Sequence, residues 1–243
     1  QLTFTGTVYN ANQQTYTAAA GNNFLVNAGA QTTFTSTDDA IAFNTGDLLL
    51  ADGSDLVVTS GGGAITVQGI RGTSDEDVTL TSTGGTTNTV SVGAIGNLNE
   101  INTVALTGST SVTLNGNITT SDAAGNTVTV TGPALLGADV TVDTDNVTND
   151  GNIQFTSTIN NAQALSLQAG DADVTVGGAI GNSAALASLD IDGANISIAN
   201  IGGAGAGVTG VTDVNATSQL TFTGTVYNAN QQTYTAAAGN NFL

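Results

Sequence analysis

The sequence predicts an all-β protein built as a parallel β-helix, or β-solenoid, with about nine to ten coils per repeating unit. Three observations predict this fold. Short apolar-polar-apolar triplets recur along the whole chain, and 32 glycines against a single proline favour strands joined by tight turns. In addition, residues 1–25 return without any change at 219–243, so the sequence restarts after 218 positions. Fixed-period repetition of this kind is typical of solenoids and arrays.

The triplets are the strand signal, because alternation with a period of two buries one face of a strand. They have an apolar residue at each end, except that residues 32–34 begin with Thr32, and a small or polar residue between. They are residues 2–4, 32–34, 41–43, 65–67, 78–80, 90–92, 112–114, 128–130, 140–142, 153–155, 165–167, 174–176, 189–191 and 196–198.

The spacing of the triplets predicts coils rather than long strands. From Val128 the triplets begin 12, 13, 12 and 9 residues apart. After two glycine turns the next similar strand arrives at the same offset along the chain, from Val90 to Val112 and from Val174 to Ile196. A coil of about 22 to 24 residues with two or three short strands fits this spacing. Tandem β-sandwich domains of about 109 residues remain the alternative.

The repeat also predicts the domain organisation. Residues 1–218 form one complete unit, and residues 219–243 begin the next identical one. Within the unit, Leu2-Thr-Phe-Thr-Gly6 is similar to Val112-Thr-Leu-Asn-Gly116, which divides it into two unequal sub-repeats of about 1–110 and 111–218. An array of such units provides length and many equal surfaces, so we look for function in the array.

Composition and charge limit the partners. The chain carries 19 acidic residues and one basic residue, Arg71, for a net charge of −18, and it has no Lys, Cys or Met. Such a chain repels nucleic acid and anionic membranes, so we expect neither as a partner. No apolar run approaches the roughly 20 residues that cross a bilayer, so we expect no membrane insertion. Few tryptic sites and no oxidisable sulfur suit an extracellular location.

A family resemblance points the same way. The segments Val174–Ile198 (VTVGGAIGNSAALASLDIDGANISI) and Gln13–Thr17 (QQTYT) resemble the β-strand repeats of giant bacterial adhesins, namely filamentous haemagglutinin and related two-partner-secreted proteins. The resemblance implies a right-handed β-helix, export to the cell surface as a secreted fibre, and an elongated stalk.

We expect no enzyme. A chain without His, Cys or Lys lacks the commonest nucleophiles and general bases, which leaves carboxylates and hydroxyls. Paired carboxylates can hydrolyse glycosides, and the pairs here are Asp171 with Asp173 and Asp190 with Asp192. In Leu189-Asp190-Ile191-Asp192 the apolar residues take the buried face, which places both aspartates on a solvated one.

Calcium is the only cofactor that the composition suggests, since hard cations take oxygen ligands from Asp, Asn and backbone carbonyls. The predicted ligands are Asp143, Asp145, Asn146 and Asp150. Two further acidic clusters occur at residues 52–55 and 75–77. The alternative is that these are acidic turns, kept soluble by charge.

The sequence therefore predicts a structural segment of an extracellular fibre or adhesin stalk. Its partners would be copies of itself, stacked head to tail or in lateral bundles, and host or neighbouring cell surfaces. The alternative is a calcium-dependent, ice-binding or carbohydrate-binding repeat module. Ice binding is suggested by Thr-x-Thr motifs, which would present hydroxyls on one face if stacked. They start at residues 3, 15, 33, 79 and 127.

Overall fold

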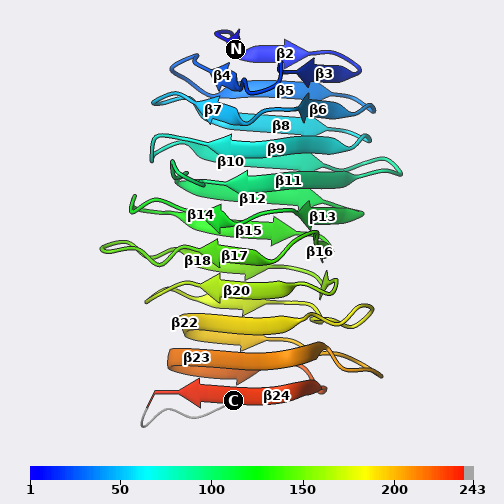
Figure 1. Cartoon of the computed structure of the whole chain (residues 1–243), viewed down its shortest axis with the longest axis vertical. Helices are drawn as coiled ribbons and strands as arrows, with labels where there is room; N and C mark the ends of the chain where they lie inside the picture. Colours follow the sequence, from blue (N-terminus) through cyan, green and yellow to red (C-terminus); the bar gives the residue numbers. More distant parts are fainter. Residues whose placement is uncertain (238–243) are drawn as a thin grey trace.

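The computed structural model describes residues 1–237; residues 238–243, the end of the predicted second copy, lie outside the described residues. The described chain is all-β and winds into about ten stacked coils, with β1 (Leu2–Phe4) near one end of the stack and β24 (Ala229–Ala236) at the other (Figure 1). Each coil crosses three faces in the order I, II, III before it returns to face I. This confirms the predicted solenoid.

Each face is a ladder of strands from successive coils. Face I holds β1 (Leu2–Phe4), β4 (Phe24–Val26), β7 (Leu48–Leu50), the ends of β9 (Ile65–Arg71) and β11 (Thr89–Ile95), β14 (Ile118–Thr119), β17 (Val140–Asp143), β20 (Ala164–Gln168), the starts of β22 (Ser188–Ile198) and β23 (Val208–Phe222), and β24 (Ala229–Ala236). Face II holds β2 (Val8–Asn10), β5 (Thr32–Ser36), β8 (Leu56–Ser60), β10 (Asp77–Ser82), β12 (Thr103–Gly108), β15 (Thr127–Thr131), β18 (Asn152–Phe155), β21 (Val174–Val176) and the ends of β22 and β23. Face III holds β3 (Gln14–Thr17), β6 (Ile41–Asn44), the starts of β9 and β11, β13 (Ser111–Leu114), β16 (Ala134–Leu136), β19 (Ile159–Asn160) and single bridges at Ile180, Ile201 and Tyr227.

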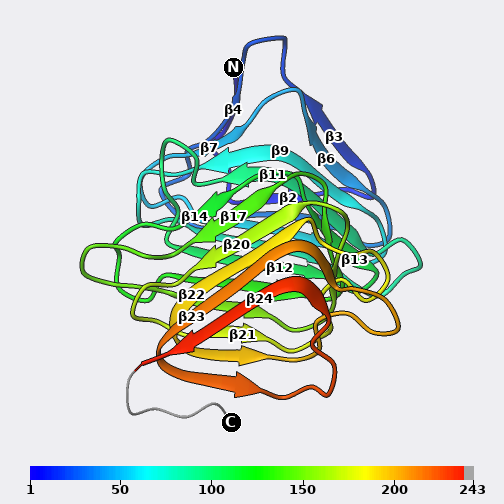
Figure 2. The same ribbon diagram turned by 60° about the horizontal axis from the view of Figure 1, so that its bottom comes forward.

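The coil is right-handed, as the resemblance implies. In Figure 1 the near strands β14, β17, β20 and β24 run to the left, while the chain descends from its N-terminus. Figure 2 shows the strands of the opposite side, β21 among them, running to the right. Motion to the left in front and to the right behind, combined with descent, is a right-handed screw.

The predicted coil length is confirmed at the two places that suggested it. Val90 pairs with Val112, and Val174 pairs with Ile196. Every strand pairing among residues 1–237 is parallel. The alternative of tandem sandwiches is therefore wrong, because a sandwich is made of antiparallel strands. Each strand here finds its partner one coil away.

The core is a single column of inward side chains. In β15 (TVTVT), Val128 and Val130 are fully buried, while Thr127, Thr129 and Thr131 face outward. All the predicted triplets lie in strands, and the same alternation repeats from coil to coil. At one end of the column, Phe4, Phe24, Phe34 and Phe43 pack together in the first two coils. Because coils share one core, each coil is stabilised by its neighbours.

The boundary between the two copies falls inside a strand. β23 runs without interruption from Val208 to Phe222, so it crosses from the last residue of the unit, Ser218, into the second copy. Its first part pairs on face I with β22, and after the corner Leu220 pairs with Ile196 on face II. The described part of the second copy therefore continues the solenoid as its next coil.

Candidate functional site

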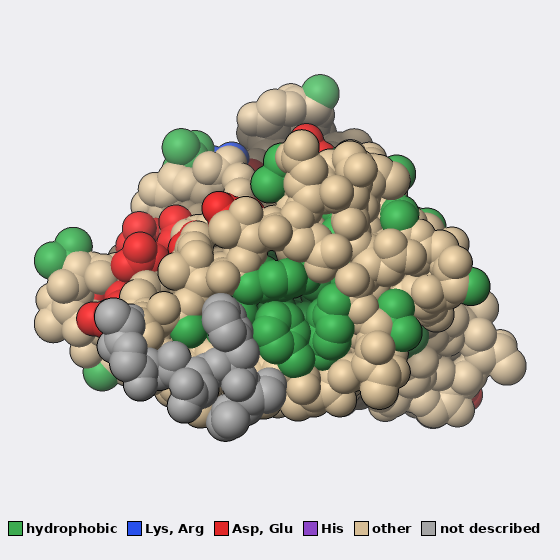
Figure 3. Space-filling model, turned by 90° about the horizontal axis from the view of Figure 1, so that it is seen from below, with side chains coloured by type: hydrophobic (Ala, Val, Ile, Leu, Met, Phe, Trp, Pro, Cys, Tyr) green, Lys and Arg blue, Asp and Glu red, His purple; other side chains and the backbone are tan. Residues whose placement is uncertain are grey.

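The main concave site is an open groove of about 800 Å³ beside the loop that follows β17. It is lined by carboxylates from three successive coils, and by amides and backbone. The carboxylates are Asp145, Asp150, Asp171 and Asp192. The end view in Figure 3 shows acidic side chains gathered at one edge of the solenoid. Oxygen is the donor that this groove offers, which suits a hard cation.

Three of the four predicted calcium ligands, Asp145, Asn146 and Asp150, line this groove, and the structure brings the carboxylates of two of them together. A methyl group on Gly170 would lie 2.5 Å from Oδ2 of Asp150 and 2.6 Å from Oδ1 of Asp145, so both carboxylates meet over this glycine. Asp150 also accepts the N–H groups of Asn146 (2.7 Å) and Asp171 (2.6 Å). Its carboxylate thus ties the loop to the next coil.

The other two predicted ligands are placed differently. Asp143 ends β17, and its Oδ1 accepts the N–H of Asp145 at 3.1 Å. The amide nitrogen of Asn146 donates to the carbonyl oxygens of Ser121 (3.0 Å) and Thr144 (3.3 Å). The groove instead gains Asp171 and Asp192 from the following coils. Sequence reasoning missed these two as possible ligands, because they join the site only through stacking.

Calcium binding at the groove stays a prediction, with a direct test. We expect millimolar calcium to raise the melting temperature relative to chelated protein, since a ligand at a hundredfold excess over its Kd adds about 2.7 kcal/mol of stability. Asp145→Asn should remove most of this shift, whereas Asp38→Asn, outside the groove, should keep it. Identical calorimetric traces with chelator and with calcium would contradict the prediction.

The electrostatics of the site oppose ionisation. Partial burial raises the pKa of Asp145, and the nearby charges of Asp150 and Asp143 raise it further. Burial also raises the pKa of Asp190, with Asp192 as the next cause. A carboxyl whose pKa is higher in the folded state binds its proton more tightly there than in the unfolded chain. Its charged form therefore destabilises the fold.

The raised pKa values of Asp145 and Asp190 make the stability of the fold depend on pH. Asp145 and Asp190 contribute stability when protonated, and this contribution is lost as pH rises through their raised pKa values. We therefore expect the melting temperature to rise as the pH is lowered from 7 toward these raised pKa values, helped by the falling net negative charge. The double variant Asp145→Asn/Asp190→Asn should show a weaker rise in a calorimetric pH series. A melting temperature that falls over this range would contradict the assignment.

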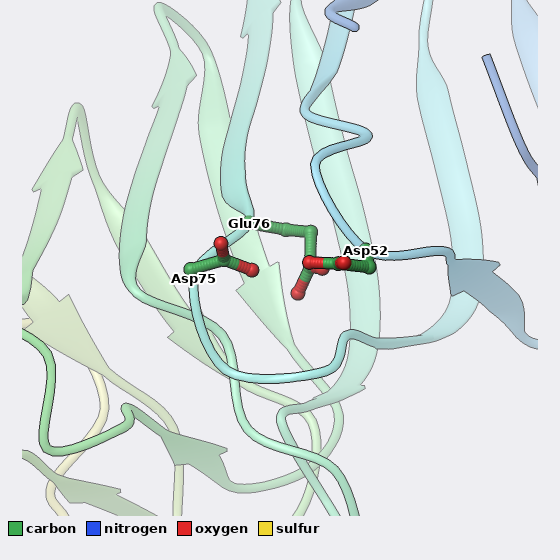
Figure 4. Close-up of side chains that lie close together, drawn as sticks. All are labelled: Asp52, Asp75 and Glu76. Atoms are coloured by element: carbon green, nitrogen blue, oxygen red, sulfur yellow. The ribbon is translucent and has the colours of Figure 1, made fainter. Parts of the chain in front are cut away.

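A second acidic cluster joins residues from two coils. Asp52 lies beside Asp75 and Glu76, with one carboxylate oxygen of each within 4.8 Å of the others (Figure 4). Glu76 is fully buried, and its carboxylate accepts the N–H groups of Thr73 (2.6 Å) and Ser74 (3.2 Å) and the hydroxyl of Thr73. Burial raises its pKa, but these hydrogen bonds outweigh burial and lower it. Glu76 thus acts as an ionised anchor for its own turn.

Several other carboxylates connect coils, a role that sequence reasoning missed. Oδ1 of Asp55 accepts the N–H of Asp77 one coil later, and Oδ1 of Asp77 accepts the N–H and hydroxyl of Thr103. Asp173 accepts the N–H of Asn195 in the same manner. The signal was available, since these residues recur next to the strands of face II. Many acidic residues therefore stabilise the stack in addition to charging its surface.

The predicted orientation of the aspartate pair in β22 is confirmed. Leu189 and Ile191 are buried, while Asp190 and Asp192 are partly exposed on face I. Asp190 stacks in register on Asp213 of the next coil and accepts hydrogen bonds from Ser166 and Gln168.

Threonines on face II are brought into register although their motifs are unevenly spaced in the sequence. One outward column consists of Thr35, Thr59, Thr81, Thr107 and Thr131. The column beside it alternates between threonine and apolar residues: Thr33, Val57, Thr79, Ala105 and Thr129. The motifs at residues 3 and 15 lie on faces I and III instead. Three of the five predicted motifs therefore share one face.

No helix within residues 1–237 has the length and apolar sequence needed to span a membrane. Comparison with protein-family models, with curated proteins and with solved structures finds no match to this chain.

Proposed function

We propose that the chain is a structural segment of an extracellular fibre or adhesin stalk, in which tandem 218-residue units add length and stiffness. The observation that carries the proposal is the strand β23, which passes through the repeat boundary without a break. A linker at this boundary would divide the array into separately folded units. A shared strand supports a single rod instead, whose length grows with the number of units.

Stiffness would come from the ladders. Each inner coil pairs with the coil before and the coil after it on three faces, and the core continues between coils. Bending such a rod would stretch backbone hydrogen bonds on one side and compress packed side chains on the other. The proposed role is mechanical, with surface attachment at sites presented along the rod.

Exposure outside the cell is supported by how the one basic residue is held. Arg71 lies within β9, and its guanidinium forms a 2.5 Å ion pair with Asp47. Cleavage by a trypsin-like protease needs this residue in an extended, accessible segment, which a ladder strand does not provide. Because the unit has no Lys, this is the only such site. We propose the cell surface or a secreted fibre as the location.

The length of the rod tests the proposal. Strands stack about 4.8 Å apart, so a unit of nine to ten coils should advance about 45 Å. Electron microscopy of chains with two, four and six units should show straight rods that lengthen by this increment. A beaded, bending chain, or the increment of about 70 to 80 Å that two separate sandwich-sized domains per unit would give, would overturn the proposal. Antibody labelling of intact source cells tests the location separately.

The threonine columns of face II favour a second candidate function, binding to an ordered surface such as ice. Their outward hydroxyls repeat at the strand spacing along the axis, and two residues apart along β5, β10 and β15. Ice crystals grown with the protein should become faceted, and Thr81→Lys/Thr107→Lys should abolish the effect. If the ice crystals keep their ordinary shape, the ice-binding function is wrong, and this result does not affect the fibre proposal.

A further inference from the structure

The described part of the second copy, residues 219–237, repeats side-chain contacts of the first copy. In the first copy the Tyr9 hydroxyl accepts the N–H of Gly6 at 2.9 Å, and in the second the Tyr227 hydroxyl accepts the N–H of Gly224 at 2.8 Å. The ring centroids of Phe4 and Tyr16 lie 5.0 Å apart. Those of their counterparts in the second copy, Phe222 and Tyr234, are also 5.0 Å apart. Equivalent residues can therefore be compared directly.

The two copies nevertheless lie on different faces. Leu2 to Phe4 belong to face I, whereas their counterparts Leu220 to Phe222 pair with Ile196 to Ile198 on face II. Tyr9 belongs to face II, and its counterpart Tyr227 bridges to Ile201 on face III. Tyr16 belongs to face III, and Tyr234 pairs with Val214 on face I. All three positions have moved forward by one face.

This displacement fixes the number of coils in a unit. Nine steps along the face I ladder lead from Leu2 to the start of β23, and one further corner leads to Leu220 on face II. The unit therefore contains nine and one third coils, which agrees with the predicted coil of about 22 to 24 residues. A whole number of coils would have returned Leu220 to face I.

The weaker internal repeat obeys the same rule. Leu2 lies on the first coil of face I, and its counterpart Val112 lies on the fifth coil of face III. Ile41, on the second coil of face III, and Ile153, on the seventh coil of face II, are likewise separated by four and two-thirds coils. Two such sub-repeats make nine and one third coils. The fractional coil is thus a property of both levels of repetition.

We propose that each junction joins the β22 edge at Ile196–Ile198 to the first strand of the next copy, and that every unit is thereby turned by one face relative to the last. This rests on the proposed array. Three units, or 28 coils of about 4.8 Å, are then needed before the pattern returns to the same side, about 134 Å along the axis.

The rotation has a consequence for attachment. A site carried by one unit, such as the threonine columns, would face a second direction in the next unit and a third in the one after. No single side of the rod would carry a continuous stripe of that site. The fibre would instead present equivalent sites in three directions around its axis. Such an arrangement allows one fibre to bind several neighbouring surfaces at once, and multivalency would strengthen this binding.

The junction can be tested in the 243-residue chain, which has no cysteines of its own. Ser197 and Thr221 are in register on adjacent strands of face II. Their Cα atoms should be about 4.8 Å apart, within the range that a disulfide spans. Ser197→Cys/Thr221→Cys should cross-link on mild oxidation. Asp190→Cys/Thr221→Cys would cross-link only if the second copy returned to face I, and this result would overturn the inference.

The rotation is tested in a six-unit chain with a Val147→Cys label in every unit, because Val147 is 97% exposed. Gold labels imaged by electron microscopy should recur on one side of the rod at every third unit. Labels on one side at every unit would refute the rotation while leaving the rod intact. A beaded chain would instead refute the fibre proposal, so the two failures are distinguishable.

Discussion

Replacing Phe34 with alanine is expected to lower the free energy of unfolding by about 3 to 5 kcal/mol. Phe34 is fully buried, and its ring centroid lies 4.8 Å from that of Tyr9, 5.0 Å from that of Phe4 and 5.1 Å from that of Phe43. Phe34 lies in the second coil, in register with Tyr9 of the first coil and Val58 of the third, so the space that its ring leaves is bounded on both sides. The cavity therefore adds to the lost burial.

The second copy supplies a matched control. Phe222 has the sequence surroundings of Phe4 and contacts Tyr227 and Tyr234, but it is only partly buried. Phe222→Ala should therefore cost clearly less than Phe34→Ala. Urea unfolding followed by tyrosine fluorescence would measure both, since all four tyrosines lie in the two copies. Equal losses would show that the aromatic cluster of the first coils is not what holds them together.

Gly181→Val is expected to lower the free energy of unfolding by a similar amount, because it strains the backbone. Gly181 has a φ of 68°, where a residue with a side chain pays about 1 to 2 kcal/mol. Its added Cβ would also lie 1.9 Å from the carbonyl oxygen of Gly207, which accepts the N–H of Leu186 at 2.9 Å. The corner must open and this bond must lengthen, so we expect a total loss of at least about 3 kcal/mol.

Gly205 provides the comparison for this variant. A methyl group added there meets nothing within 4 Å, so Gly205→Ala should change the midpoint of urea unfolding very little. If Gly181→Val unfolds at the same urea concentration as Gly205→Ala, close packing of coils at the Gly181 corner does not limit stability.

The strands that could be predicted are those with a complete triplet. β10, β15 and β21 each carry an apolar residue on either side of a threonine, and the alternation alone identifies them. β14 and β19 have two residues each, too few for a period to be visible. In β7 the middle residue, Leu49, is apolar, so the outward position has no polar signature. These strands exist because the coils above and below supply partners, which is tertiary information.

The site was predictable only in part for the same reason. Acidic residues close in sequence, such as Asp145 and Asp150, could be grouped by inspection. Asp171 and Asp192 join them from later coils, and Asp52 meets Glu76 across a coil. The register of the threonine columns was hidden because loops of different length separate the strands. The loops at the corners differ in length, whereas the backbone hydrogen bonds between coils keep the strands in register.

The rise of the solenoid also sets a linear charge density. All charged residues lie between Asp38 and Asp213, so each unit of an array carries the full −18. Spread over about 45 Å, this is one negative charge per about 2.5 Å of axis, against one per about 1.7 Å for duplex DNA. An array would therefore be a polyelectrolyte, surrounded by a sheath of condensed counterions. Parallel rods would repel one another at low ionic strength, and release of the sheath would drive their binding to cationic surfaces.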